Sequence, residues 1–305
     1  MNSRETIKCK FNEPVNVLYL TNIPAPYRVS FFNELGKYCN LTVLFERDFA
    51  HNRESSWLDK SADNYKQVFL KGVSMGNGKI ICVEVLKWLR KGKFDVVVVG
   101  GYSPPTHILA MLYMRLLKKG FILSVDGGFV KNDQVSKKFF KRYLVSSASI
   151  WLSTGRETDK FLIHYGAKEE RVYRYPFTSL MNEDILNDIP TIIEKKRIRE
   201  KLGISESKMI ISVGQFIYRK GFDVLLNAAK LIDKDIGIYI IGGNPTPDYI
   251  SHKEKMKLEN VHFIGFKSKE ELKKYYMAAD LFVLPTREDI WGLVINEAMA
   301  NGLPV

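Results

Sequence analysis

Cysteine is scarce in this sequence, and no stretch of it is apolar enough to suggest a membrane span. Cys9, Cys39 and Cys82 show no C-x-x-C spacing, which disfavours both a disulfide framework and a zinc site. The longest apolar candidate, near His107, is interrupted by Arg115, and residues 1–10 are polar, without the apolar core of a signal peptide. These absences predict a reduced, cytoplasmic protein.

Several nucleotide- and metal-binding motifs are also missing. The turn after the first expected strand, residues 21–27, contains two prolines and no G-x-G-x-x-G sequence, which disfavours a dinucleotide-binding turn. The segment 214–221 lacks the spacing of a Walker A loop, so ATP hydrolysis is not indicated. The histidines have no partners at metal-ligand spacing and are interpreted as packed or exposed. We therefore expect no metal and no cofactor.

Positive charge is concentrated in the first part of the chain. The 305 residues have a net charge of +12; residues 1–180 contain 28 Lys and Arg against 16 Asp and Glu, whereas residues 181–305 contain 18 of each. A basic half suits an anionic membrane, an acidic substrate or nucleic acid, and a merely solvated face is the alternative. Because no nucleic-acid-binding motif is visible, we expect no nucleic acid partner.

One basic segment, residues 137–143 (KKFFKRY), interleaves cations and aromatic residues along an expected helix. Lys137, Lys138, Lys141 and Arg142 would meet lipid phosphates while the rings enter the interface. Core packing of the same rings is the alternative, because aromatic residues at helical spacing are often buried. The first interpretation predicts peripheral contact with the inner face of an anionic membrane.

Apolar strands and amphipathic helices alternate along the whole chain. Runs such as VNVLYL (15–20), FDVVVV (94–99) and MIISV (209–213) are typical of buried parallel strands. The alternation predicts an α/β fold with two Rossmann-like, doubly wound domains that face a cleft. A shift in composition near 180–190 divides the chain into domains 1–185 and 186–305. At about 30 residues per strand–helix unit, we expect roughly two more units after Val305, so the second domain is predicted to be incomplete.

The segment 214–221 (GQFIYRKG) follows a predicted strand and precedes a helix. Main-chain N–H groups and a cation at a helix N-terminus together favour an anion. Lys220 stands at this point, so the segment is a candidate phosphate site, with an exposed lysine as the alternative.

Acidic residues follow two other predicted strands. Asp289 lies before a helix that begins near Gly292, and Glu297 lies within that helix, so both carboxylates can reach a ligand crevice. A helix-capping acid and a solvated glutamate are the alternative. In the first half of the chain, Asp126 follows the run FILSV, where either an active-site carboxylate or an Asx turn with two glycines fits the sequence.

The C-terminal sequence Asp289-x-Trp-Gly-Leu-Val-x-Asn-Glu297-Ala-Met-Ala-x-Gly-Leu-Pro-Val resembles the signature of glycosyltransferase family 4, which comprises retaining enzymes with the GT-B fold. The family usually has Glu at the first position; here Asp289 aligns with it and Glu288 lies one residue earlier, so both are candidates for this catalytic acid. The resemblance implies that this first acid contacts the donor sugar or the carbon under attack. It implies that Glu297 holds the ribose hydroxyls, with Trp291 and Gly292 in the same donor site.

The segment 214–221 resembles the family's G-R-L-x-x-x-K-G sequence, whose Arg and Lys hold the donor diphosphate. Lys220 and Gly214 match, whereas Gln215 replaces the Arg, and we infer that Arg219 supplies the missing charge.

Three further positions follow from the same resemblance. The turn at Gly265 would meet the nucleobase. Asp126 corresponds to a residue beside the donor sugar. Tyr27 and Arg28 lie in the loop that approaches the diphosphate and the acceptor, where a purely structural turn is the alternative.

The resemblance implies a retaining, metal-independent, hexosyltransferase-like enzyme. Such an enzyme moves a sugar from a nucleoside diphosphate sugar to a glycan or lipid-linked acceptor, as in cell-surface polysaccharide synthesis. One alternative is a nucleotide-sugar epimerase of the same architecture, for which the sequence offers no extra acid and base groups. A non-catalytic nucleotide-binding protein is another.

Overall fold

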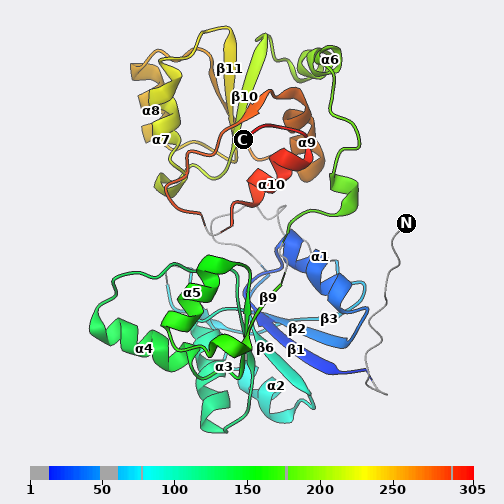
Figure 1. The fold of residues 1–305 in the computed structure, drawn as a ribbon, viewed down its shortest axis with the longest axis vertical. Coiled ribbons are helices and arrows are strands. Elements are labelled where there is room, and N and C mark those ends of the chain that lie inside the picture. The colour runs from blue at the N-terminus through cyan, green and yellow to red at the C-terminus, as the bar shows by residue number, and fades with distance from the viewer. Residues whose placement is uncertain (1–13, 49–60, 77, 176–177, 290) are drawn as a thin grey trace. The chain divides into compact units, whose positions relative to one another are not determined.

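The computed structural model describes residues 14–48, 61–76, 78–175, 178–289 and 291–305 (Figure 1). The chain divides into two compact units, Met1–Phe177 and Thr178–Val305. The division falls earlier than the boundary after residue 185 that the composition predicts. The reason is that the intervening segment bonds to the second unit: Lys269 donates to Asp184 at 2.6 Å, and the N–H of Leu186 donates to the carbonyl of Ala300 at 2.9 Å.

The N-terminal unit contains a parallel sheet with the strand order β3-β2-β1-β6-β7-β8-β9 among its described residues (Figure 1). Its strands are β1 Asn16–Thr21, β2 Asn40–Phe45, β3 Lys66–Phe69, β6 Val96–Val99, β7 Ile122–Val125, β8 Ile150–Ser153 and β9 Val172–Arg174. A short antiparallel ribbon, β4 Val73–Ser74 with β5 Ile80–Ile81, was not predicted. Because the chain builds outward in both directions from β1, the topological switch lies between β1 and β6.

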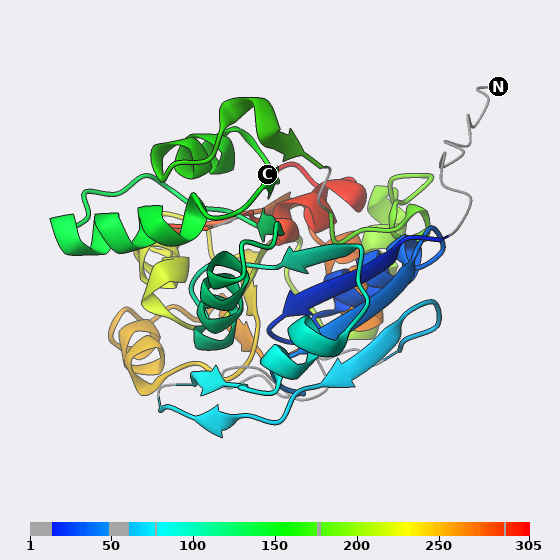
Figure 2. The same cartoon turned by 90° about the horizontal axis from the view of Figure 1, so that it is seen from below.

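Helices cover both faces of this sheet (Figures 1 and 2). They are α1 Pro26–Leu35, α2 Val85–Lys91, α3 Pro105–Leu116, α4 Val135–Val145 and α5 Arg156–His164. Alternate residues of β1 serve two cores, because side chains of a strand point to opposite faces. Leu18 and Leu20 join the core with residues of α2 to α5, whereas Val17 and Tyr19 pack with Phe32 of α1.

The C-terminal unit repeats the pattern with the parallel order β12-β11-β10-β13 in its described part. Its strands are β10 Lys208–Val213, β11 Ile236–Ile241, β12 Val261–Ile264 and β13 Leu281–Phe282, and its helices are α6 Ile192–Leu202, α7 Phe222–Ala229, α8 Pro247–Lys255, α9 Lys269–Ala278 and α10 Leu293–Ala300. One core joins the sheet to α6, α9 and α10, and another joins it to α7 and α8. The switch lies between β10 and β13, the two strands whose following segments carry Lys220 and Asp289.

Local signals set the ends of α6. Thr191 accepts from the N–H of Glu194, whose carboxylate accepts in return, and Gly203 ends the helix with φ 71°. Arg199, on the buried side of α6, donates to the carbonyl of Ala278 at 2.9 Å and pairs with Asp280 at 2.6 Å. These bonds fasten α6 to the end of α9.

Across the described residues, no helix is both long and apolar enough to cross a bilayer.

Candidate active site

In the C-terminal unit, the loop after β10 packs against the turn after β13. The main-chain N–H of Arg287 and the hydroxyl of Thr286 donate to the carbonyl of Arg219, at 2.9 Å and 3.0 Å. Gly221 has a left-handed φ of 69°, and a Cβ atom there would lie 2.0 Å from the carbonyl oxygen of Pro285. Only glycine permits this approach. The two segments that the sequence singles out are therefore held together by main-chain contacts.

Two predicted donor-site cations surround one predicted acid at this junction. The Nζ atom of Lys220 lies 2.5 Å from Oδ2 of Asp289, and Nη1 of Arg219 lies 3.7 Å from Oδ1. The Lys220 and Asp289 side chains are 12% and 20% exposed, so the pair is largely shielded from water. Glu288 is exposed, and its main-chain carbonyl accepts from Arg219 at 2.7 Å. The carboxylate beside Lys220 is thus that of Asp289.

Arg287 anchors the turn and was missed by sequence reasoning. It binds both carboxylate oxygens of Asp223, at 2.8 Å and 2.5 Å, donates to the carbonyl of Tyr218 at 2.7 Å, and lies 4.1 Å from the centre of the Tyr218 ring. The hydrogen bonds from Arg287 to the Asp223 carboxylate lower the pKa of that group. A charged residue inside an acid-rich turn gives no sequence signal of its partner 64 positions away.

Glu297 is half-buried on the second turn of α10. Its two carboxylate oxygens accept from the hydroxyls of Tyr276 at 3.2 Å and Ser179 at 3.3 Å. Burial raises its pKa, although these two bonds oppose the shift. It is therefore not a freely solvated helix glutamate. Tyr276 and Ser179 were not anticipated, because the sequence does not show that they converge on this carboxylate.

The other predicted donor-site residues occupy loops and helix ends of the same unit. Gly292, with φ 69°, precedes α10, and Trp291 beside it is half-buried. Gly265 is exposed directly after β12, and a Cβ atom there would meet nothing within 4 Å. Gln215 and Gly214 follow β10, and the Lys220 side chain passes 3.4 Å from the place where a Cβ of Gly214 would lie.

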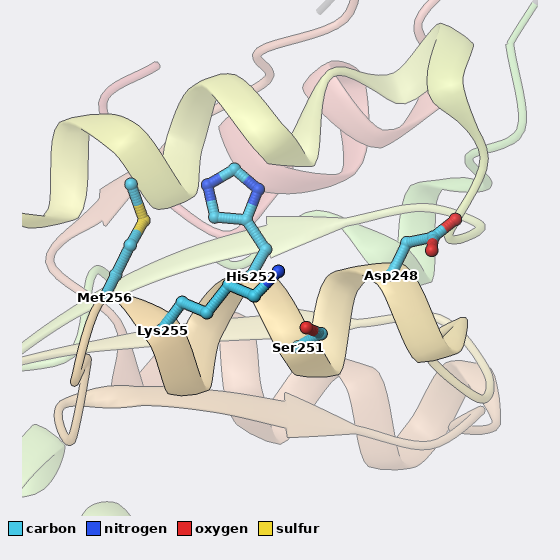
Figure 3. A pocket seen from close by; sticks show the side chains of 5 residues that line it. All are labelled: Asp248, Ser251, His252, Lys255 and Met256. Carbon is cyan, nitrogen blue, oxygen red and sulfur yellow. The ribbon is translucent and has the colours of Figure 1, made fainter.

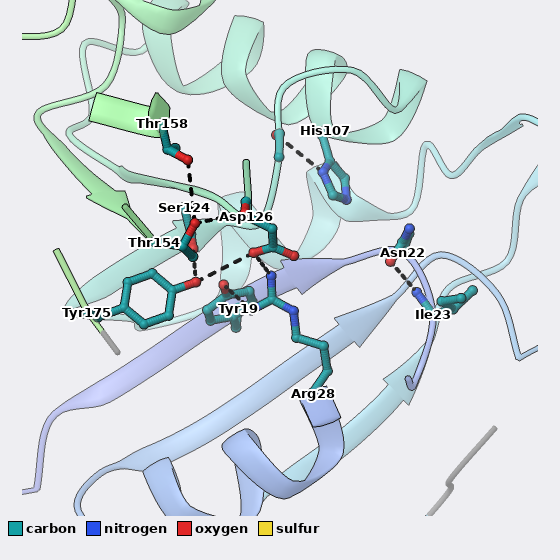
Figure 4. Close-up of polar contacts among 11 residues, drawn as sticks. Tyr19, Asn22, Ile23, Arg28, His107, Ser124, Asp126, Thr154, Thr158 and Tyr175 are labelled. Carbon is teal, nitrogen blue, oxygen red and sulfur yellow. Dashed lines mark hydrogen bonds and ion pairs between the residues drawn. The ribbon is translucent and has the colours of Figure 1, made fainter. Parts of the chain in front are cut away.

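In the N-terminal unit, Asp126 forms an ion pair with Arg28 (Figure 4). Arg28 is 4% exposed, and its guanidinium also donates to the hydroxyl of Tyr19 at 3.4 Å. The hydroxyl of Tyr175 donates to the same Asp126 oxygen at 3.5 Å, and Thr154 donates to the Asp126 carbonyl at 2.7 Å. Two predicted residues from separate loops are thus brought together. Tyr27, the neighbour of Arg28, is half-buried.

A buried pair of the same unit, Glu46 directly after β2 and His107 near the start of α3, was missed by sequence reasoning. Oε1 of Glu46 and Nε2 of His107 lie 3.9 Å apart, and neither atom has a hydrogen-bond partner among the residues that the structure describes. The other ring nitrogen of His107 lies 3.3 Å from the carbonyl of Gly101, to which it donates (Figure 4). Burial lowers the pKa of His107 to about 4 and raises the pKa of Glu46. The sequence shows a histidine in an apolar helix, which agrees with packing, but does not show the acid opposite it.

A pocket of about 340 Å³ lies along α8 and is lined by Asp248, Ser251, His252, Lys255 and Met256 (Figure 3). None of the predicted site residues lines it. His252, one of the residues that line the pocket, lies 3.3 Å from the side-chain oxygen of Asn227.

The β10–α7 loop, the β13–α10 turn and Glu297 all lie in one stretch of sequence that a known family shares. Residues 194–305 match the family model of glycosyl transferases group 1. This match contains Lys220, Asp289 and Glu297. It supports the glycosyltransferase superfamily as the origin of the C-terminal unit.

Relatives extend the similarity over more of the chain. An uncharacterized 41.2 kDa protein in the cps region of Klebsiella pneumoniae is 26% identical over 230 residues, which are 72% of this chain and 62% of that protein. A D-inositol 3-phosphate glycosyltransferase of Xylanimonas cellulosilytica is 24% identical over 298 residues, 93% of this chain and 64% of the relative. The chain thus spans less than two thirds of the length of these curated relatives.

Solved structures show the fold. The crystal structure of Anabaena Alr3699/HepE in complex with UDP and glucose has a TM-score of 0.73 at 15% identity and covers 95% of this chain and 80% of its own. A putative UDP-N-acetylglucosamine 2-epimerase from Listeria monocytogenes has a TM-score of 0.62 at 14% identity, covering 96% and 78%. The predicted fold class, two α/β domains of the GT-B type, is confirmed.

Proposed function

We propose that this protein is a retaining glycosyltransferase of family 4 that transfers a sugar from a nucleoside diphosphate sugar to a glycan or lipid-linked acceptor. The observation that carries the proposal is the junction of Lys220 and Arg219 with Asp289, on two loops at the topological switch of the C-terminal sheet. Ligands of open α/β sheets bind at such points. The match of residues 194–305 to group 1 glycosyl transferases supports the same conclusion.

The donor diphosphate is assigned to the β10–α7 loop. Lys220 and Arg219 provide positive charge, and the N-terminus of α7 adds main-chain N–H groups next to Gly221. In the reaction, the acceptor hydroxyl forms a bond to the sugar carbon while the bond between the sugar and the diphosphate breaks. Negative charge grows on the departing phosphate, which takes up the proton of the acceptor hydroxyl. Cations and dipoles already in position stabilise that charge without reorganisation, so the proposed mechanism needs no metal.

The nucleoside and the sugar are assigned to the segments on either side. Glu297 accepts hydrogen bonds from the ribose hydroxyls, and the exposed turn at Gly265 receives the base. Asp289 contacts the sugar, next to Trp291 and Gly292. Because Tyr276 and Ser179 already bond to Glu297, its carboxylate is oriented before the ribose arrives.

The N-terminal unit is assigned to the acceptor. Asp126 is the proposed active-site carboxylate of this unit, and Arg28 and Tyr175 orient it. The buried position of Arg28 supports a positioning role for its side chain, whereas half-buried Tyr27 is the residue of this loop that is assigned to the acceptor itself.

Helix α4 is the proposed contact with an anionic membrane, where a lipid-linked acceptor would be found. Phe139 is 72% exposed and Phe140 47%, which argues against core packing of these rings, and Val135 on the same helix is 86% exposed. Lys137 and Lys138 are exposed among them, whereas Lys141 bonds to Asp133 at 2.6 Å. Exposed apolar side chains flanked by cations suit the lipid interface. A cytoplasmic protein attached at the inner face of the membrane fits this surface.

The test is incubation of the protein with UDP-, GDP- and ADP-sugars, with and without membrane extract, followed by chromatography and mass spectrometry. Transfer or slow hydrolysis of one donor identifies its base and sugar. An epimerase, the second candidate because solved epimerases share the fold, would change the retention time of the nucleotide sugar without changing its mass. Binding without any conversion would favour a non-catalytic protein and contradict the proposal.

A further inference from the structure

In the proposed donor site, two anions would bond to Lys220: the Asp289 carboxylate and the donor diphosphate. Its Nζ atom lies 2.5 Å from Oδ2 of Asp289, a charge-assisted contact, and the remaining oxygen of that carboxylate lies 3.7 Å from Arg219. The Asp289 carboxylate therefore interacts with both cations, Lys220 and Arg219, that the proposed function assigns to the diphosphate. A phosphate that bonds to Lys220 would place its negative charge directly beside Asp289. Like charges this close disfavour each other strongly where water is largely excluded.

The surroundings allow this conflict to be relieved by a side-chain movement. The turn that carries Asp289 is fastened by the bonds from Thr286 and Arg287 to the Arg219 carbonyl and by the Arg287–Asp223 pair. None of these bonds involves the Asp289 carboxylate. A change of its rotamer thus breaks none of these bonds.

We propose that the donor diphosphate displaces Asp289 from Lys220, so that the carboxylate turns toward the transferred sugar only when the diphosphate is bound. The inference rests on the proposed function. In this exchange, Lys220 replaces its carboxylate partner with a phosphate. The released Asp289 carboxylate then contacts the transferred sugar. A nucleoside without phosphates leaves the ion pair intact.

The exchange predicts that loss of the carboxylate strengthens phosphate binding. In Asp289→Asn, Lys220 no longer has to give up an ionic partner, so inorganic pyrophosphate, UDP, GDP and ADP should bind more tightly, by at least about fivefold, the upper range of a surface ion pair. The matching nucleosides should bind as they do to the parent. Turnover should fall, because the sugar loses its acid.

The experiment is calorimetric titration of the parent protein, Asp289→Asn, Lys220→Ala and the double variant with these probes, after thermal melts have established that each is folded. In the double variant most of the gain from Asp289→Asn should vanish, because Lys220 lies closer to this carboxylate than Arg219 does. Glu288→Gln is the matched control: it removes an acidic charge one residue away and should change pyrophosphate affinity by clearly less.

The outcomes separate the exchange from the proposed function. If the parent binds a nucleoside diphosphate and Lys220→Ala weakens it, but Asp289→Asn binds no better than the parent, the donor site stands and the exchange is wrong. A gain of the same size in Glu288→Gln, or one that persists in full in the double variant, also overturns the exchange, since it would not act through Lys220. A folded parent that binds none of the probes contradicts both.

Discussion

Arg28 and Asp126, which are 98 residues apart in the sequence, form an ion pair between the start of α1 and the end of β7. The guanidinium is almost completely buried, whereas the Asp126 side chain is 34% exposed. The arginine therefore has little access to water, and Asp126 and the Tyr19 hydroxyl are among its polar partners, while the Asp126 carboxylate is partly exposed to solvent. The buried Arg28 side chain thus has a structural role, whereas the partly exposed Asp126 carboxylate can have the proposed catalytic role.

Asp126→Asn should destabilise the N-terminal unit, because it removes the negative charge that Asp126 places beside a buried guanidinium. We expect a loss of about 1–3 kcal/mol, less than for a fully buried pair. Urea unfolding measures it, with Asp63→Asn, an exposed aspartate of the same unit, as the control. Replacing Arg28 by Met in the same protein should recover part of the loss. A variant as stable as the parent would show that the pair does not hold the fold.

Lys220→Ala should weaken binding of a nucleoside diphosphate more than binding of the nucleoside. A charge-assisted contact to phosphate contributes about 1.5–3 kcal/mol, which corresponds to roughly tenfold to hundredfold in affinity. Calorimetry of both ligands gives the ratio, and Lys230→Ala, at the opposite end of α7, is the matched control. Equal losses for the two ligands would mean that Lys220 only supports the fold.

Glu297→Gln should weaken nucleoside and nucleoside diphosphate alike, by about tenfold or more, because a neutral amide replaces an ionic acceptor. Burial raises the pKa of Glu297, so in the parent protein the carboxylate becomes protonated at a higher pH than a surface glutamate does. Affinity should therefore decline on mild acidification in the parent and stay flat in the variant. Glu270→Gln, exposed on α9, is the control. Parent-like binding by Glu297→Gln would remove the strongest support for the ribose assignment.

His107 should make the N-terminal unit sensitive to acid. Its pKa is about 4 in the folded protein against 6.5 for the free side chain, so the unfolded chain takes up the proton first. Stability is therefore lost as the pH falls from about 6.5 to 4, by about 3 kcal/mol in all. Glu46, whose pKa is raised, acts in the opposite direction and gives the folded state a gain on acidification.

Acid unfolding, followed by circular dichroism, tests the His107 prediction. His107→Asn keeps a donor for the Gly101 carbonyl and should flatten the pH dependence of stability, whereas Glu46→Gln should steepen it. His252→Asn on α8 is the control. An unchanged pH profile in His107→Asn would contradict the prediction.

Replacing Lys137, Lys138 and Arg142 by Ser should reduce cosedimentation with anionic vesicles, because cations near the headgroups contribute about 1 kcal/mol each. Lys141 is left in place, since it bonds to Asp133 and its loss would disturb α4. Three exposed lysines of the C-terminal unit, Lys196, Lys201 and Lys208, serve as the control set. Equal binding by both variants would exclude α4 as the anchor.

Local sequence determined much of this protein. Buried parallel strands appear as short apolar runs, and α6 carries both its capping box and its terminal glycine, because these features depend on neighbours a few residues away. For the same reason the position of Lys220 just before α7 could be predicted, along with an acidic turn before α10.

Only the tertiary structure decided which of these groups meet. Lys220 and Asp289 are 69 residues apart, and Glu297 receives the hydroxyl of Ser179 from 118 residues away. Glu46 and His107 also come from separate elements, and only the fold shows that their side chains lie 3.9 Å apart. Contacts, burial and the resulting pKa shifts depend on segments that are far apart in the sequence. A sequence pattern therefore identifies the polar and charged side chains of a site, but not the partners that determine their chemistry.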